Sequence, residues 1–299
     1  MLINMQKIKF VCDSAADITK EAAEKFNISI VPVVIVYECK EHLEHYEIDP
    51  VEYWDLLEST KVIPNTCQVP ITSFLEQFER ALNEGYTHLI LSVLNSKGSG
   101  SYNTANTAKE MFYEEHGRTM EICVLDSGIY AVAHGNVVLE AAKKYEQGVC
   151  FEEIVLFMEE LFSRTESIFL VLSLKQMKKS GRISGGAAFV GEALGLKPII
   201  HAYNGEITVI DKVRGEKQCV NKSIDYIDKL IDKDFPQSMW IIHGKVSNEL
   251  YDYFKEAVSK FGVELKISKI GPSVATNTGP NLLALTFYGK DKRFNVNNS

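Results

Sequence analysis

Four short segments concentrate small polar residues beside predicted strands, where their side chains could hold an anion. They are residues 13–17 (DSAAD), 64–70 (PNTCQVP), 95–102 (NSKGSGSY) and 271–280 (GPSVATNTGP). Hydroxyl, amide and backbone N–H groups of this kind can donate hydrogen bonds to the oxygens of a phosphate or a carboxylate. The chemistry that these segments offer is therefore the binding of a small acidic group.

The segment 95–102 is the most specific of the four. Its hydroxyl residues Ser96, Ser99 and Ser101 and its two glycines precede a predicted helix, whose first backbone N–H groups have no partner within the helix. The segment is not a Walker loop, because no GK[ST] follows, and it is not the GxGxxG of a dinucleotide site. Two interpretations stay open, an anion site and an ordinary capped helix.

The familiar catalytic and metal-binding patterns do not occur in the sequence. His42 and His45 stand in a charged stretch, KEHLEHYE, that is typical of a solvated face rather than a metal site. There is no GxSxG or HExxH motif, and the 40 acidic residues form no paired motif suited to acid–base work. For Asp13 we favour a helix cap without any ligand. We therefore predict no catalytic residue, no metal and no cofactor.

The composition indicates a folded, acidic, cytoplasmic protein. The net charge of −8 and the pI near 5.5 give no electrostatic footprint for general nucleic-acid binding, and anionic lipid headgroups would repel such a surface. The 6 cysteines are dispersed without a CxxC, which favours a reducing compartment. The first apolar stretch is too short for a secretory signal, and no apolar run approaches the roughly 18 residues of a membrane span.

The elements that must position these segments fall into two groups. Strand-like and helical runs alternate in the first half, which predicts a mostly parallel sheet with ligands beyond the carboxyl ends of its strands. Residues 28–38 read as one strand interrupted by Pro32. The second half contains a hairpin, 197–215, around Asn204-Gly205. We predict an α/β protein of two domains: an N-terminal mostly parallel α/β sandwich (1–160) and a C-terminal α+β domain with antiparallel strands (161–290), followed by a polar tail (291–299).

Seven motifs in this order resemble the DegV family. They are DSAAD, PNTCQVP, NSKGSGSYNTA, VLDS, KKSGRIS, GLKPII with its NG turn and KVRG, and IGPSVATNTGP. Members of that family are bacterial cytoplasmic fatty-acid carriers and the binding subunit of fatty acid kinase. The resemblance implies a non-enzymatic carrier that holds a long-chain fatty acid in an internal tunnel. It also implies that the carrier presents the carboxylate to a separate ATP-dependent kinase, which makes the acyl-phosphate.

The resemblance implies which residues bind the carboxylate. The matching positions are Thr66, Ser96, Ser99, Gly100, Asn277 and Thr278. Ser99 corresponds to the serine of an SSxLSGTY-like loop, and Ser96 is the nearby alternative. Two departures stand out, since Cys67 replaces a serine and Asn277 replaces a histidine of an HTGPG-like turn. The second replacement removes any charge assistance from that position.

The resemblance also implies a surface that faces the kinase, made of Lys212, Arg214 and Arg182. The alternative is a solvated hairpin edge that keeps other strands away, which is a common use of lysine. For the tunnel lining, the small-residue run 185–195 is a candidate, and tight helix-to-sheet packing explains that run equally well. A second function stays open, an enzyme that acts on a small anionic metabolite with the loop 96–101 as its anion cradle.

Overall fold

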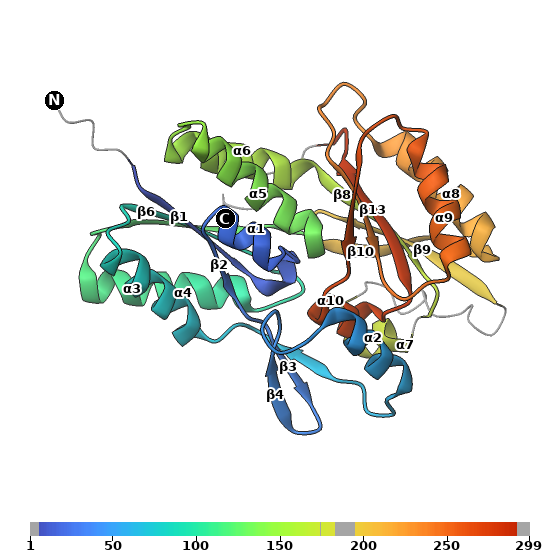
Figure 1. The fold of residues 1–299 in the computed structure, drawn as a ribbon, viewed down its shortest axis with the longest axis horizontal. Helices are drawn as coiled ribbons and strands as arrows, with labels where there is room; N and C mark the ends of the chain where they lie inside the picture. The colour runs from blue at the N-terminus through green and yellow to red at the C-terminus, as the bar shows by residue number, and fades with distance from the viewer. Residues whose placement is uncertain (1–5, 174, 183–194, 292–299) are drawn as a thin grey trace.

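A computed structural model describes residues 6–173, 175–182 and 195–291 of the chain, and Figure 1 shows their arrangement. Of the predicted tunnel-lining run, 185–195, all but Gly195 lies outside these residues. None of the helices in the described ranges is both long and apolar enough to cross a membrane. The chain folds into two halves that lie side by side, each built on its own large sheet (Figure 1).

The first half is built on a four-stranded parallel sheet. Its strands are β1 (Ile8–Asp13), β2 (Ile28–Val31), β6 (His88–Val93) and β7 (Glu121–Asp126), in the order β2-β1-β6-β7. The helices of this half are α1 (Lys20–Lys25), α3 (Ile71–Asn83), α4 (Ser101–His116), α5 (Ala131–Glu146) and α6 (Phe151–Arg164). Successive residues of β1 point to opposite faces of the sheet. Val11 packs with residues of α3 and α4, while Phe10 packs with residues of α1, α5 and α6.

The predicted strand 28–38 is in fact two strands in two different sheets. β2 ends at Val31, and β3 (Val34–Tyr37) lies in the middle of a small antiparallel sheet with β4 (Lys40–Leu43) and β5 (Asn65–Cys67). Pro32 separates them because proline has no N–H to donate to a sheet ladder. α2 (Pro50–Ser59) follows, and the side chain of Asp49 caps its N-terminus.

The second half is built on a six-stranded, mostly antiparallel sheet. Its strands are β8 (Thr165–Val171), β9 (Leu196–Tyr203), β10 (Glu206–Arg214), β11 (Met239–His243), β12 (Leu265–Lys269) and β13 (Leu282–Tyr288). Their order is β10-β9-β8-β13-β11-β12, and only β11 and β12 pair in parallel. The predicted fold class is confirmed: a parallel α/β half is followed by a half with antiparallel strands.

Helices cover one face of this second sheet, and its other face meets the first half. α8 (Glu216–Leu230) and α9 (Asn248–Ser259) pack on the side of Ile168 and Leu170. Phe169 and Val171, which alternate with them along β8, belong to the apolar cluster that continues into the first half. The face of β8 that carries Phe169 and Val171 therefore forms a wall between the two halves.

Two short helices, α7 (Lys175–Ser180) and α10 (Pro272–Thr278), join the second sheet to this boundary. The sequence motif 271–280 suggests a turn, but the structure forms a helix there. Pro272 suits the first helical position because its missing N–H would have no helical partner, and Gly279, at φ +88°, ends the helix. The predicted domain boundary after residue 160 falls inside the last turn of α6.

Candidate ligand-binding cavity

A cavity of about 300 Å³ lies between the two halves. Its apolar lining comes mainly from the second sheet and its helices and includes Phe169, Val171, Met177, Ile207 and Val274. Its polar lining includes Thr66, Ser99, Ser273, Asn277 and Thr278. A space of this size, with a largely apolar wall and a few converging polar groups, is typical of a small-molecule site.

The loop between β6 and α4 forms one side of the cavity and is held by hydrogen bonds from three directions. The backbone N–H of Leu94 donates to Asp13 Oδ2 at 2.6 Å. The side-chain amide of Asn95 donates to Tyr130 Oη at 2.7 Å and to the carbonyl oxygen of Gly205 at 2.7 Å. Gly205 belongs to the β9–β10 hairpin turn, so this loop is tied to both halves of the molecule.

Glycines allow this loop to approach its neighbours closely. A Cβ atom at Gly98 would lie 2.2 Å from Tyr130 Oη, and one at Gly100 would lie 1.9 Å from Gln68 Oε1. Gln68 in turn donates to Thr104 Oγ1 at 2.9 Å. The glycines predicted from the sequence to shape an anion loop therefore serve close packing against Tyr130 and Gln68.

The hydroxyl and amide groups at the polar end contact one another across the two halves. The side-chain amide of Asn277 donates to Thr66 Oγ1 at 3.2 Å and to the carbonyl oxygen of Ser273 at 2.9 Å. Ser99 Oγ lies 3.0 Å from Ser101 Oγ, which also accepts from the backbone N–H of Val69 at 3.2 Å. This end of the cavity can therefore offer neutral donors to the oxygens of a carboxylate.

The structure brings most of the predicted carboxylate-binding residues to one place. Thr66, Ser99, Gly100, Asn277 and Thr278 all line the cavity. The alternative residue, Ser96, does not line it. Its hydroxyl and its backbone N–H both donate to Asp126, beside a separate open groove along the edge strand β7.

The three residues predicted to face a partner are divided between two places. Arg182 lines the cavity, has an exposed side chain and donates to the carbonyl oxygen of Ser180 at 2.8 Å. Lys212 and Arg214 lie toward the end of β10 that is remote from its hairpin turn. Because a strand rises by about 3.3 Å per residue, Arg214 lies roughly 23 Å along β10 from the cavity-lining Ile207.

A group of acidic side chains that the sequence does not reveal lies behind the cavity. The predicted capping role of Asp13 is wrong: its side chain does not cap the following turn but accepts the N–H of Leu94, from the loop that follows β6. Glu44, which lies in the stretch that reads as a solvated face, is 2% exposed and accepts from the hydroxyl of Ser14 at 2.5 Å. Burial raises the pKa of Asp13 to about 7, and burial also raises the pKa of Glu44. The spacing of Asp13 and Asp17 is visible in the sequence, but nothing in KEHLEHYE distinguishes Glu44.

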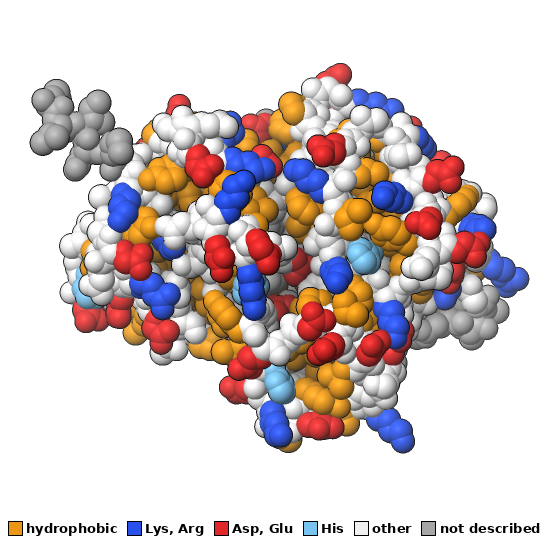
Figure 2. Space-filling view, viewed as in Figure 1, with side chains coloured by type: hydrophobic (Ala, Val, Ile, Leu, Met, Phe, Trp, Pro, Cys, Tyr) orange, Lys and Arg blue, Asp and Glu red, His pale blue; other side chains and the backbone are white. Residues whose placement is uncertain are grey.

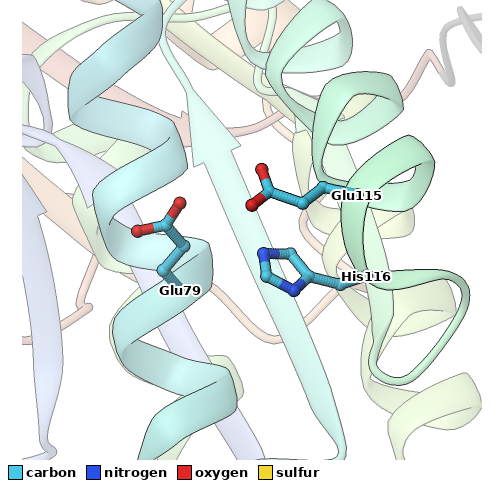
Figure 3. Close-up of side chains that lie close together, drawn as sticks. All are labelled: Glu79, Glu115 and His116. Atoms are coloured by element: carbon cyan, nitrogen blue, oxygen red, sulfur yellow. The ribbon is translucent and has the colours of Figure 1, made fainter.

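One group of described residues has ligand atoms close enough to hold a metal ion. Glu79 on α3 and Glu115 and His116 on α4 bring their ligand atoms within 4.8 Å of one another (Figure 3). Both carboxylates are exposed, and none of the three residues lines the cavity. His42 and His45 do not belong to this group. Exposed acidic groups commonly lie together without an ion, so we assign no metal role to them.

The fold and the cavity define a class of protein: two α/β halves that enclose an amphipathic cavity at their boundary. Comparison with known sequences gives the family, because residues 7–290 match the profile described as an uncharacterised protein of the DegV family. The chain therefore belongs to the DegV family. A DegV domain-containing protein from Caldanaerobacter subterraneus is 32% identical over 292 residues, covering 96% of this chain and 100% of its own.

Solved structures give the same fold. A fatty acid (stearic acid)-binding protein from Eubacterium ventriosum superposes with a TM-score of 0.85 at 27% identity, covering 96% of this chain and 99% of its own. DegV from Bacillus subtilis, described as a fatty acid binding protein, gives a TM-score of 0.82 at 27% identity, covering 95% and 100%. The resemblance found in the sequence motifs is thus confirmed along nearly the whole chain.

Proposed function

We propose that this protein binds a long-chain fatty acid in the cavity between its two halves. The observation that carries the proposal is the polarity of the cavity, which has an apolar wall from β8 and β10 and neutral hydroxyl and amide groups at one end. The carboxylate contacts Thr66, Ser99 and Asn277, and the acyl chain lies against Phe169 and Ile207. The similar proteins from Eubacterium ventriosum and Bacillus subtilis, described as a stearic-acid-binding and a fatty-acid-binding protein, support this assignment.

Simple energetics support the same division of roles. Burial of each methylene contributes about 0.8 kcal/mol, so a chain of about 16 carbons supplies on the order of 10 kcal/mol before the costs of association. The carboxylate then needs only to keep its hydrogen bonds after it leaves water. Neutral donors such as the hydroxyl groups of Thr66 and Ser99 can satisfy it without an ion pair.

We propose further that the protein is a cytoplasmic carrier that presents the bound carboxylate to a separate ATP-dependent kinase. Arg182 supports this view, because its exposed guanidinium group lies at the cavity and could donate hydrogen bonds to the phosphate oxygens of ATP. Figure 2 shows acidic and basic side chains interspersed over one face. A local cluster of cations would therefore be surrounded by charges of both signs rather than by a uniformly acidic surface. Arg214 would then contribute at a second point of the partner surface.

The partner surface is tested with Arg214→Ala. We expect the variant to bind fatty acid as the parent does and to slow acyl-phosphate formation several-fold when the cognate kinase and ATP are supplied. The loss should shrink at high salt because screening weakens the parent's contact as well. If the variant keeps both the parent's rate of acyl-phosphate formation and its affinity for fatty acid, Arg214 is a solvated residue of the hairpin edge and not part of a partner surface.

The binding function is tested by denaturing the purified protein, extracting it into organic solvent and analysing the extract by mass spectrometry. We expect one fatty acid per chain. A lipid-free extract, together with no binding of added fatty acid, would contradict the proposal. It would favour an enzyme that acts on a small anionic metabolite at the loop 96–101.

A further inference from the structure

Two carboxyl groups, those of Asp13 and Glu44, stand directly behind the wall of the cavity. Asp13 accepts the N–H of Leu94 at 2.6 Å, and Glu44 accepts the N–H of Ser273 at 2.6 Å. Leu94 and Ser273 both line the cavity, so each of these two carboxyl groups is separated from it by one residue. Asp13 is 0% exposed and Glu44 is 2% exposed. Any ligand charge in the polar end of the cavity is therefore close to both.

Asp17 completes this carboxyl cluster, which we define as Asp13, Asp17 and Glu44. The backbone N–H of Gly271 donates to Asp17 Oδ2 at 3.1 Å. A Cβ atom at Gly271 would lie 2.0 Å from Asp17 Oδ1 and 3.3 Å from Glu44 Oε1, so both carboxyl groups face the same stretch of backbone before α10. The cluster thus links the β1 turn and the β4 end to the helix that carries Asn277.

The described part of the chain gives the carboxyl cluster no ion-pair partner. No Lys, Arg or His forms an ion pair with any of its members within the described ranges. The groups that face Glu44 are the Ser14 hydroxyl from the β1 turn, Ser273 from α10, the other two carboxyl groups and the Tyr53 phenol from α2. Oδ1 of Asp13 is buried without a hydrogen-bond partner.

Buried carboxyl groups without cations hold their protons to unusually high pH. Burial raises the pKa of Asp13 to about 7, with a smaller contribution from the nearby charge of Glu44. Burial and the same neighbour raise the pKa of Asp17 well above its usual range, and burial raises that of Glu44. The cluster can therefore change its charge near neutral pH, where ordinary carboxyl groups are fully ionised.

We propose that binding of an anionic ligand in this cavity is coupled to proton uptake by the carboxyl cluster, so that affinity falls as pH rises. The inference rests on the proposed fatty-acid function and adds a regulatory property to the same site. A ligand carboxylate placed beside the cluster disfavours the ionised form of its members, so their pKa values rise further in the complex. By linkage, the complex binds more protons than the empty protein.

The direction of the pH dependence follows from the pKa of the cluster in the empty protein and its higher pKa in the complex. Below the pKa of the empty protein the cluster is protonated in both states, and affinity does not change with pH. Above it, near pH 7 for Asp13, the complex must take up a proton that the empty protein has lost. Affinity then falls up to about tenfold per pH unit for each proton taken up, until the pKa of the complex is passed.

The test measures the Kd of dodecanoic acid and of 1-dodecanol between pH 6 and 9, below the concentrations at which they aggregate. The free acid is almost completely ionised across this range, so a rise in Kd with pH reports protons taken up when the complex forms, and the variants below show whether the carboxyl cluster takes them up. We expect the Kd of dodecanoate to rise at least fivefold, while that of the uncharged alcohol stays constant. Binding of dodecanoate with no dependence on pH would overturn the inference and leave the proposed function standing.

Matched variants test which carboxyl groups take up the proton. Asp13→Asn and Glu44→Gln keep size and an acceptor oxygen but do not titrate, so we expect each to reduce the pH dependence and to bind dodecanoate more tightly than the parent at pH 9. Glu115→Gln, an exposed carboxyl group outside the cavity, should keep the parent's dependence. An unchanged slope in both cluster variants would overturn the assignment to these residues.

A second measurement needs no variant and so does not depend on how the variants fold. The heat of dodecanoate binding to the parent is measured by calorimetry at pH 8 in phosphate and in Tris. The two heats differ by the number of protons taken up multiplied by the difference between the ionisation enthalpies of the two buffers. We expect uptake of a substantial fraction of one proton, and equal heats in the two buffers would overturn the coupling. Failure of both dodecanoate and dodecanol to bind would instead overturn the proposed function.

Discussion

The two sides of the cavity are built in different ways. The apolar side is formed by strands of a six-stranded sheet, where Phe169 and Val171 are positioned by pairing on both sides of β8. The polar side is formed by loops, the short edge strand β5 and the short helix α10, whose positions depend on individual hydrogen bonds such as Asn277 to Thr66. A regular sheet offers a smooth apolar surface of fixed shape, whereas loops offer separate donors. We infer that the sheet side supplies most of the affinity and that the loop side selects the head group.

Shortening the ligand tests the sheet side and has the largest expected effect. Each methylene removed from the acyl chain should weaken binding about fourfold, because about 0.8 kcal/mol of burial is lost. A change from 16 to 12 carbons would then raise Kd roughly 200-fold. Displacement of a fluorescent fatty acid measures the series. Affinity that is independent of chain length would place the binding energy on the loop side instead.

Removal of single hydroxyl groups tests the loop side. Thr66→Val and Ser99→Ala should each weaken fatty-acid binding by about 1–3 kcal/mol, because a ligand oxygen loses a donor without a change in fold. Ser96→Ala is the matched control, since that hydroxyl donates to Asp126 and does not line the cavity. Isothermal titration of the three variants measures the difference. Parent-like affinity in both Thr66→Val and Ser99→Ala would mean that the ligand carboxylate does not bind at this end of the cavity.

The smallest effect is expected for Asn277→His. An imidazole at this position can still donate toward Thr66 and can add positive charge near the carboxylate, so affinity should stay equal or improve by up to about fivefold. The same titration measures it. A loss of more than tenfold would mean that the amide of Asn277, with its bonds to Thr66 and Ser273, is itself essential to the geometry of the loop side.

The sequence predicts the regular parts of this molecule well, because their patterns are local. The helix α4 begins at Ser101, where the hydroxyl-rich run predicts a helix start, and the hairpin turns at Asn204-Gly205, where both residues have positive φ. The motif order also places Thr66, Ser99 and Asn277 among the candidate residues, all of which line the cavity.

The missed features depend on contacts between distant segments. Glu44 is buried against α10, more than 200 residues later, where it accepts the N–H of Ser273. The role of Asp13 depends likewise on Leu94, from the loop that follows β6 about 80 residues later. Pro32 indicates an interruption of the strand. The sequence does not indicate that β3 leaves the parallel sheet and joins a separate small sheet. Local spacing carries no information about such partners.

The place of β13 has a consequence for how the protein is made. β13 is the last of the described strands in sequence order, yet it lies between β8 and β11 and pairs with both. Until Leu282–Tyr288 has left the ribosome, β8 and β11 each keep an unpaired edge, and the wall that carries Phe169 has no support on that side. A chain that stops before Leu282 should therefore be an aggregation-prone fragment without ligand, because the sheet that carries the cavity wall lacks its central strand.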